Sequence, residues 1–347
     1  MWGVTVVICS YNGSGTLPVV LAHLAAQQIP PGLPWEVLVI DNGSTDETAA
    51  VARKRWSSAA PSPLRVIVEP QLGLNQARLR GLREARYELV SFIDDDNGPA
   101  PDWIRTVADI MGRHPEVGAC GGAIEAVCET VPPPWFNTVQ HYYAVGEQAQ
   151  RAGDVTWSRG YLWGAGLTVR KSAWEALVSH GFRFHLSDRA GHEMSSGGDA
   201  ELCLALRLAG WKLWYEPAIT MKHFIPASRL AWPYLERVAR GFGDAAVVLN
   251  AYAMVREDRS TSTIVRLRSS WLCQVFVTMV RLLRAYGQCL LALSGWEGNV
   301  AVLEMIYRRE VLIQFLRVRA GYDALCRHIH AMWDSHTVPS AAIHQDA

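Results

Sequence analysis

The strongest constraint on the fold is a series of short apolar runs, each closed by polar residues and separated from the next by a stretch with helical character. The runs occupy residues 4–9, 36–40, 65–68 and 88–93. Short buried runs that alternate with helices indicate βαβ units and a parallel sheet. We therefore predict an α/β fold in which helices flank a mostly parallel sheet.

Polar residues follow three of these runs at the point where the predicted strand ends. Ser-Tyr-Asn occupies positions 10–12, Asp41 follows the second run, and Asp94-Asp95-Asp96 follow the fourth. Ligands of open parallel sheets bind at the carboxyl ends of the strands. We expect these three groups to line one crevice.

The acidic triplet is the most informative of the three groups. Consecutive carboxylates repel one another unless a cation or a set of donors compensates, and Mg²⁺ or Mn²⁺ shares its ligands between carboxylates and substrate phosphates. Side chains at i and i+2 of an extended chain point the same way, so Asp94 and Asp96 can face one cleft as a DxD motif, with Asp95 in a supporting role. The alternatives are a solvated acidic turn and a HAD-type phosphatase, whose nucleophilic Asp follows the first strand rather than the fourth.

Two further segments of the first half are candidates for nucleotide contacts. Asp41 could accept hydrogen bonds from a base or a ribose hydroxyl, or it could serve as a turn or capping residue. The segment 71–81 opens a helix after Gly73, and a helix N-terminus with a nearby arginine suits a diphosphate. Arg78 is thus a candidate phosphate ligand, with a structural role as the alternative.

The second half holds candidates for the acid–base chemistry. Asp199 starts a predicted helix after two glycines, and it is either an N-cap or a general base for an acceptor hydroxyl. Glu201 is a weaker second candidate for the base. His223 follows a predicted strand and is either a structural histidine or the remaining protein ligand of a metal.

The last third of the chain is predicted to be mostly helical, from residue 229 to residue 333. Residues 269–280 and 285–296 carry no charge, and Arg281 and Arg284 separate them. Neither run reaches the roughly 18–20 apolar residues that span a bilayer. The two interpretations are a packed helical subdomain and a pair of helices lying on a membrane surface.

Composition narrows the class of protein. The formal net charge is zero, without the basic stripe that nucleic-acid binding requires, so no nucleic-acid partner is expected. The seven cysteines form no CxxC pair, which favours reduced thiols in a cytoplasmic protein over disulfides or zinc. The N-terminus is interpreted as a first strand rather than a signal peptide. Trp135, Tyr161 and Trp163 are candidate sugar platforms, although core packing is the alternative in a chain with 14 tryptophans.

Several motifs together resemble the family 2 glycosyltransferases with the GT-A fold, over roughly residues 4–226. VTVVICSYNGSGTL resembles the first strand and nucleotide-binding loop, and VLVIDNGSTDET the second strand and its Asp turn. GLNQARLRGL is similar to the glycine-helix segment, SFIDDDN to the metal motif, GAGLTVRK to the acceptor-side strand, and GGDAELCLALRLAGW to the region of the catalytic base.

The resemblance implies an inverting transfer of a hexose-type sugar from a nucleotide-linked donor with Mn²⁺ or Mg²⁺, a UDP-sugar being the leading expectation. Asp96 and His223 would hold the metal and Asp199 would be the base. The family often has Glu where this chain has Gly198, which affects acceptor contacts. The predicted nucleotide-sugar-binding residues are Ser10, Tyr11, Asn12, Asp41, Asn75, Arg78, Asp94 and Asp95. The predicted acceptor residues are Trp135, Tyr161, Trp163, Gly164 and Glu201.

These observations predict a glycosyltransferase domain over residues 1–228, with a nucleotide-sugar half (1–117) and an acceptor half (118–228). A helical region (229–334) and a flexible tail (335–347) follow. We expect a role in cell-surface polysaccharide or glycan biosynthesis, with a glycan or lipid-linked acceptor. The expected location is the cytoplasm, including the inner face of the membrane through the C-terminal helices, and a homodimer is left open. The rival functions are a sugar nucleotidyltransferase and a degenerate nucleotide-sugar-binding subunit of a membrane polysaccharide complex.

Overall fold

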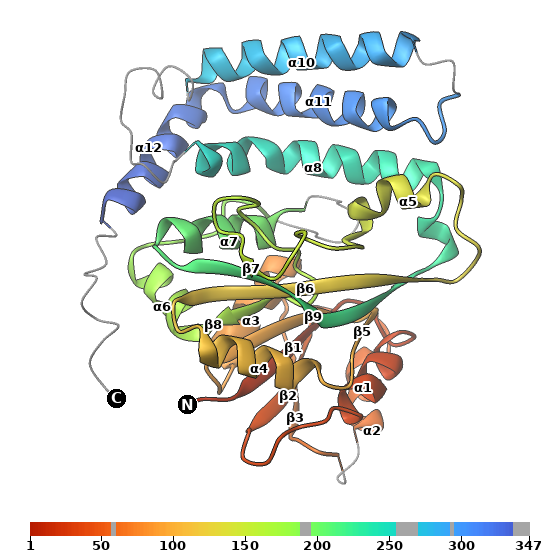
Figure 1. Ribbon diagram of the computed structural model, residues 1–347, viewed down its shortest axis with the longest axis vertical. Helices are drawn as coiled ribbons and strands as arrows, with labels where there is room; N and C mark the ends of the chain where they lie inside the picture. Colours follow the sequence, from red (N-terminus) through yellow and green to blue (C-terminus); the bar gives the residue numbers. More distant parts are fainter. Residues whose placement is uncertain (57–59, 188–195, 255–269, 292–294, 336–347) are drawn as a thin grey trace.

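The computed structural model of the chain describes residues 1–56, 60–187, 196–254, 270–291 and 295–335. Figure 1 shows the N-terminal strands of the sheet and their helices at one end of the molecule, and the long C-terminal helices stacked at the other end. Within the described residues the strands form one nine-stranded sheet in the order β3-β2-β1-β4-β8-β6-β9-β5, with β7 paired to β9.

The first four strands are parallel, as the alternating pattern predicts. Their carboxyl ends lie at one edge, because Ser10 is the register partner of Asp41, and Cys9 that of Asp94. This half consists of β1 (Val4–Ser10), α1 (Leu17–Ala25), β2 (Trp35–Asp41), α2 (Thr48–Arg55), β3 (Leu64–Val68), α3 (Leu74–Glu84) and β4 (Leu89–Asp94).

The second half adds mostly antiparallel pairings around the long strand β9. Strand β5 pairs with β9 so that Asn97 lies opposite His223, which brings the residue after the acidic triplet beside the histidine. The elements are β5 (Asn97–Pro99), α4 (Trp103–Arg113), β6 (Val117–Cys128), α5 (Phe136–Val139), η1 (Gln140–Tyr143), β7 (Gly153–Asp154), β8 (Thr168–Arg170), α6 (Lys171–Ser179), α7 (Gly198–Leu208), β9 (Lys212–Ile225) and η2 (Ala227–Arg229).

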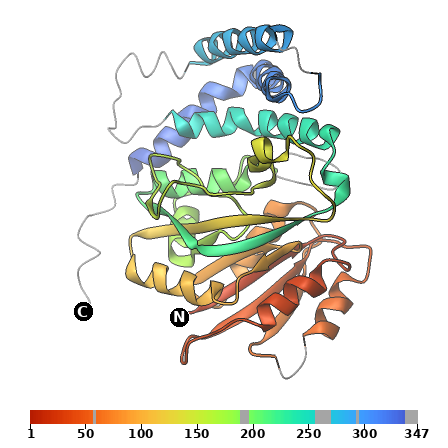
Figure 2. The same ribbon diagram turned by 45° about the vertical axis from the view of Figure 1, so that its right-hand side comes forward.

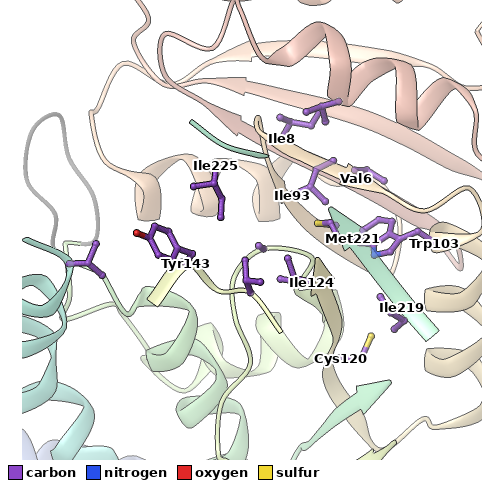
Figure 3. Close-up of a cluster of buried hydrophobic side chains, with 14 of the residues drawn as sticks. Val6, Ile8, Ile93, Trp103, Cys120, Ile124, Tyr143, Ile219, Met221 and Ile225 are labelled. Atoms are coloured by element: carbon purple, nitrogen blue, oxygen red, sulfur yellow. The ribbon is translucent and has the colours of Figure 1, made fainter. Parts of the chain in front are cut away.

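A buried apolar cluster joins the two halves of the sheet. Figure 3 shows Ile8 and Ile93 of the parallel strands gathered with Met221 of β9 and Trp103 of α4. All four side chains are at most 2% exposed. Fully burying a side chain of this size contributes about 1.5–3 kcal/mol, so the cluster fixes β9 against β4 and with it the place of His223.

The C-terminal third is helical, as predicted, and consists of α8 (Trp232–Ala253), α10 (Trp271–Leu291), α11 (Val300–Arg317) and α12 (Arg319–Ser335). Figures 1 and 2 show α8, α11 and α10 stacked in that order outward from the sheet. The same apolar clusters contain residues from this region and from the sheet, so packing is continuous across residue 228. Of the predicted tail, only Ser335 lies within the described residues.

None of the helices within the described residues has the length and apolar character needed to cross a membrane.

Candidate active site

The loops after β1 and β2 are tied together by their own side chains. Asn12 has a φ of 55° and its Oδ1 accepts a hydrogen bond from the backbone N–H of Thr45 at 2.8 Å. Asp41 is buried and its Oδ1 accepts from the backbone N–H of Ser44 at 3.0 Å. Tyr11 directly precedes Asn12 and is 46% exposed, so its ring is presented at the surface of these joined loops.

Asp95 lies beneath the same loop. Its Oδ2 accepts a hydrogen bond from Ser10 Oγ at 2.5 Å, and a Cβ at Gly13 would stand 2.1 Å from that oxygen. Burial raises the pKa of Asp95 to about 7, with the charges of Asp96 and Asp94 adding to it and the Ser10 hydrogen bond opposing it. These contacts turn Asp95 toward the loop after β1. Asp94 and Asp96, on either side of it, point in other directions.

Asp96 and His223 meet where β5 pairs with β9. His223 Nε2 lies 3.5 Å from Asp96 Oδ2, and its Nδ1 lies 2.9 Å from the carbonyl oxygen of Tyr143. A ring whose Nδ1–H donates to a carbonyl presents the lone pair of Nε2, which is the arrangement of a metal-binding histidine. The geometry therefore aims a carboxylate and an imidazole nitrogen at one point.

Arg229 also reaches this point, and sequence reasoning missed it. Its Nη1 lies 2.9 Å from Asp96 Oδ2. Burial would raise the pKa of Asp96, but the hydrogen bonds and charges of His223, when its imidazole is protonated and no metal occupies Nε2, and of Arg229 outweigh it and hold that pKa at about 2. Burial likewise opposes the charge on Arg229, and Asp96 reverses the effect, so the pKa of Arg229 is raised. The only signal in the sequence is an arginine six residues after His223.

The chemistry of these donors suits a divalent cation. Among the described residues there is no cluster of three or more His, Cys, Asp or Glu side chains that could hold a metal; Asp96 and His223 form a pair. One or two protein ligands completed by substrate phosphates and water is a common arrangement for Mg²⁺, and Mn²⁺ tolerates a carboxylate with an imidazole. The residues present fit such an ion.

Asp199 lies at the start of α7, but the N-cap of that helix is Gly197, at a φ of 118°. The Asp199 carboxylate instead accepts from the backbone N–H of Gly164 at 2.6 Å and from that of Ala200 at 2.9 Å. A Cβ at Gly164 would stand 2.5 Å from Arg78 Nη2 and 3.2 Å from Asp199 Oδ2. Arg78, Asp199 and the acceptor-side strand segment thus converge on one glycine.

The segment around Gly164 links this group to the acidic edge. Gly166 donates its N–H to the carbonyl of Phe92 at 2.9 Å, and Phe92 donates to the carbonyl of Leu167 at 2.8 Å. A Cβ at Gly166 would lie 3.2 Å from the methyl carbon of Met221. The segment therefore passes between β4, which leads to Asp94, and β9, which leads to His223.

Asn75 has a structural contact. Its Nδ2 donates to the carbonyl of Leu186 at 2.8 Å, which ties the first turn of α3 to the segment that precedes α7.

The three aromatic candidates separate into two groups. The Arg159 guanidinium lies 4.7 Å from the ring centroid of Tyr161 and 4.9 Å from that of Trp163, so these two rings form a cationic aromatic group beside Gly164. Trp135 is only 9% exposed, packs edge-on against Trp232, and donates its Nε1–H to Glu297. It holds the helical region to the sheet and offers no open ring face, so core packing is the better interpretation for Trp135.

Glu201 is not accessible to an acceptor in this structure. It is fully buried, and its oxygens accept from the backbone N–H groups of His185 and Leu186 at 2.9 and 3.0 Å. The hydroxyl of Tyr252 on α8 donates to the same carboxylate at 3.3 Å. The prediction of an acceptor contact is therefore replaced by a structural role: Glu201 joins α7, α8 and the segment before α7.

We expect Glu201→Ala to lower the free energy of unfolding by about 3–5 kcal/mol, because it leaves several buried donors without a partner. Glu175→Ala on α6 is the matched control: the Glu175 side chain is 63% exposed and pairs with Lys171 at 3.8 Å. It should change the free energy by no more than about 0.5 kcal/mol. Urea unfolding followed by circular dichroism measures both. Equal effects of the two variants would contradict the structural role.

Comparison with known proteins agrees with the fold. The chain matches the family described as Glycosyl transferase family 2 over residues 5–177. An uncharacterised glycosyltransferase of Mycobacterium tuberculosis is 37% identical over 218 residues, which cover 60% of this chain and 81% of that protein. The undecaprenyl-phosphate 4-deoxy-4-formamido-L-arabinose transferase of Pectobacterium carotovorum is 30% identical over 114 residues, covering 33% of this chain and 35% of that one.

Among solved structures, the mannosyltransferase PcManGT of Pyrobaculum calidifontis, in complex with GDP-Man and Mn²⁺, superimposes with a TM-score of 0.53 at 18% identity. The alignment covers 90% of this chain and 86% of that one, and at this identity it shows the shared fold.

The mostly parallel sheet with its acidic edge, together with the similarity to these proteins, defines the chain as a glycosyltransferase with the GT-A fold. The chain belongs to glycosyltransferase family 2, whose relatives include enzymes of glycan and polysaccharide biosynthesis. It spans little more than a third of the length of several curated relatives that it matches.

Proposed function

We propose that the protein transfers a sugar, with inversion, from a nucleotide-diphosphate donor to a hydroxyl of an acceptor, using Mn²⁺ or Mg²⁺. The observation that carries the proposal is the pair of polar groups that one segment of the chain links. Asp96 and His223 form the first group, and Asp199 with Gly164 and Arg78 forms the second. The segment between β4 and β9 connects them.

The nucleoside is proposed to lie over the ends of β1, β2 and β4. Tyr11 supplies an exposed ring, and Asp41 supplies a buried carboxylate at the end of β2. Asp94 supplies a carboxylate on the side of the triplet opposite to Asp95. Ser10 and Asn12 shape this surface through their hydrogen bonds rather than by direct contact. A UDP-sugar is the proposed donor; the complex of PcManGT with GDP-Man makes GDP-sugars the first alternative to test.

The diphosphate is proposed to lie between the two groups. A divalent cation held by Asp96 and His223 would neutralise the charge that develops on the departing diphosphate, and Mn²⁺ accompanies the donor in the PcManGT complex. Arg229 and Arg78 supply cationic donors on either side, because Arg229 contacts Asp96 and Arg78 lies at Gly164. Guanidinium groups bind phosphate oxygens in a bidentate manner, which orients the leaving group.

Asp199 is proposed as the general base. As the acceptor oxygen attacks the anomeric carbon, its proton passes to the Asp199 carboxylate, and the bond from that carbon to the phosphate oxygen breaks with its electron pair. The N–H of Gly164 keeps the carboxylate in place, while the remaining lone pairs stay available for the acceptor. A single displacement of this kind inverts the anomeric centre.

The acceptor is proposed to be a glycan or a lipid-linked saccharide, reached past Tyr161 and Trp163. The Pectobacterium relative is named as an undecaprenyl-phosphate transferase, which supports a lipid-linked acceptor. Such an acceptor would place the enzyme at the inner face of the cytoplasmic membrane. We further propose that residues 1–228 carry the transfer and that residues 229–334 set where the enzyme works.

Nucleotide-sugars should stabilise the protein in a metal-dependent manner. A donor at about 100 times its Kd should add about 2.7 kcal/mol to the free energy of unfolding, because it binds only the native state. Thermal shift with UDP- and GDP-sugars, with and without Mn²⁺, measures the effect. The absence of a shift with every nucleotide-sugar would contradict the proposal.

Two activity measurements separate the rival functions. Release of pyrophosphate from a nucleoside triphosphate and a sugar phosphate would identify a nucleotidyltransferase. Donor binding with neither transfer nor slow donor hydrolysis would identify a degenerate binding subunit.

A further inference from the structure

Helix α10 presents an apolar stripe to the outside of the protein. The stripe consists of large apolar side chains that are 44–85% exposed: Leu272, Phe276, Met279, Leu283, Tyr286 and Leu290. Their spacing alternates between three and four residues, which places them on one face of a helix. The stripe is about 27 Å long at 1.5 Å per residue.

The polarity of α10 is reversed relative to an ordinary packed helix. Gln274 and Thr278, both polar, are buried on its inner side beside Leu282 and Ala285. Gln274 Oε1 accepts a hydrogen bond from Asn250 of α8 at 3.3 Å. The outer face is therefore more apolar than the face that packs on the protein. Folding of an isolated chain in water does not explain this reversal, because water disfavours exposed apolar surface.

Apolar exposure continues at both ends of the stripe. Leu291 and Trp296 follow its C-terminal end and are 83% and 57% exposed. At the other end Trp271 donates its Nε1–H to the carbonyl of Phe315, and Leu316 beside it is 56% exposed. The surface is thus wider than one helix, and tryptophan occurs at each end, as at membrane–water interfaces.

The charged residues of α10 are both arginines. Arg281 and Arg284 are exposed, and the helix contains no Asp or Glu. The Arg319 guanidinium lies 5.1 Å from the ring of Trp271 at the N-terminal end. A second copy of α10 would bring no carboxylate to pair with these arginines, whereas an anionic surface would supply negative charge to all of them.

We infer that the outer face of α10 binds the surface of an anionic lipid bilayer. An apolar stripe with arginines on the remaining exposed surface of the helix is the composition of a helix that lies in the plane of the interface. The helix would lie flat, with the stripe among the acyl chains and the arginines at the lipid phosphates. The inference rests on the membrane localisation proposed above, but it concerns a surface separate from the candidate active site.

Vesicle co-sedimentation tests the inference without any donor or acceptor, so failure of the proposed reaction leaves its outcome unaffected. The vesicles are phosphatidylcholine, alone or with phosphatidylglycerol. The wild type should bind the mixed vesicles, and Phe276→Glu with Leu283→Glu should weaken binding by about tenfold or more. Val19→Glu with Val178→Glu is the matched control, since both valines are exposed on α1 and α6, and it should bind as the wild type does.

A second pair of variants tests the charges. Arg281→Gln with Arg284→Gln should remove most of the preference for anionic vesicles, and 0.5 M salt should weaken wild-type binding. Circular dichroism establishes that all variants are folded. Absence of vesicle binding by the wild type, or unchanged binding by the Phe276/Leu283 variant, would overturn the inference. A dimer in sedimentation velocity that the same variant dissociates, without vesicle binding, would assign the stripe to a second copy instead.

Discussion

Replacing Asp199 with asparagine is expected to lower the rate of sugar transfer by about 10²–10⁴-fold, the range that a positioned general base contributes. The amide keeps an oxygen that can accept from the N–H of Gly164, so the local structure should persist. What is lost is the capacity to take up the acceptor proton. Steady-state kinetics with the donor and acceptor that the binding screen identifies would give kcat, and calorimetry would give the donor Kd.

The expected result is a fall in kcat with a donor Kd close to that of the wild type. Asp109→Asn on α4 is the matched control, because the Asp109 side chain is 59% exposed and pairs with Arg113 on the same helix. It should leave both quantities unchanged. Near-wild-type kcat in the Asp199 variant would assign the base to another residue, whereas loss of donor binding would mean that Asp199 acts on the nucleotide side.

The nucleotide half of the fold could be predicted because its signals are local. Each strand is mostly apolar and is followed by polar residues, and a parallel sheet brings such ends to one edge. The register of Ser10 with Asp41, and of Cys9 with Asp94, follows that rule. The conformations within the loops, such as the hydrogen bond from Ser10 to Asp95, depend on side chains 85 residues apart and have no local signal.

The second half depends on long-range pairing. His223 lies beside Asp96 because β5, a three-residue strand, pairs antiparallel with β9. Nothing in the spacing of residues 97–99 predicts this pairing. The sequence offered His223 as either a structural histidine or a metal ligand, and the family resemblance favoured the metal ligand. Arg229 was missed for the same reason: an arginine in a short loop is usually a surface residue, and its burial follows from the approach of η2 to the acidic edge.

Helical geometry explains the separation of Asp199 from Glu201. Residues two apart on a helix point about 200° from each other at 3.6 residues per turn. When Asp199 faces Gly164, Glu201 must face the opposite side, where it accepts from Leu186 and Tyr252. The sequence alone could have excluded a shared site for these two carboxylates. The burial of Trp135 against Trp232 offers no comparable signal, because it depends on where α8 packs.

For the metal site, Asp96→Asn should remove the Mn²⁺ enhancement of nucleotide binding and lower kcat by about 10²–10³-fold, equivalent to the several kcal/mol that a Lewis acid contributes. His223→Ala should act in the same direction, since its Nε2 faces Asp96 Oδ2 at 3.5 Å. Asp102→Asn on the outside of α4 is the control, as Asp102 is 41% exposed and pairs with Arg105. The Kd of the nucleoside diphosphate, measured with and without Mn²⁺, gives the enhancement for each variant.

Arg229 makes this experiment discriminating, because its guanidinium already neutralises Asp96 at 2.9 Å. If a cation binds beside Asp96, it must compete with that ion pair or displace it, and Arg229→Gln should then strengthen Mn²⁺ binding while weakening the contact to the diphosphate. If Arg229 instead serves in place of a metal, Arg229→Gln should abolish activity and Mn²⁺ should have no effect on the wild type. The first outcome agrees with the orientation of His223, whose Nδ1 is fixed by Tyr143 and whose Nε2 is left to bind a metal.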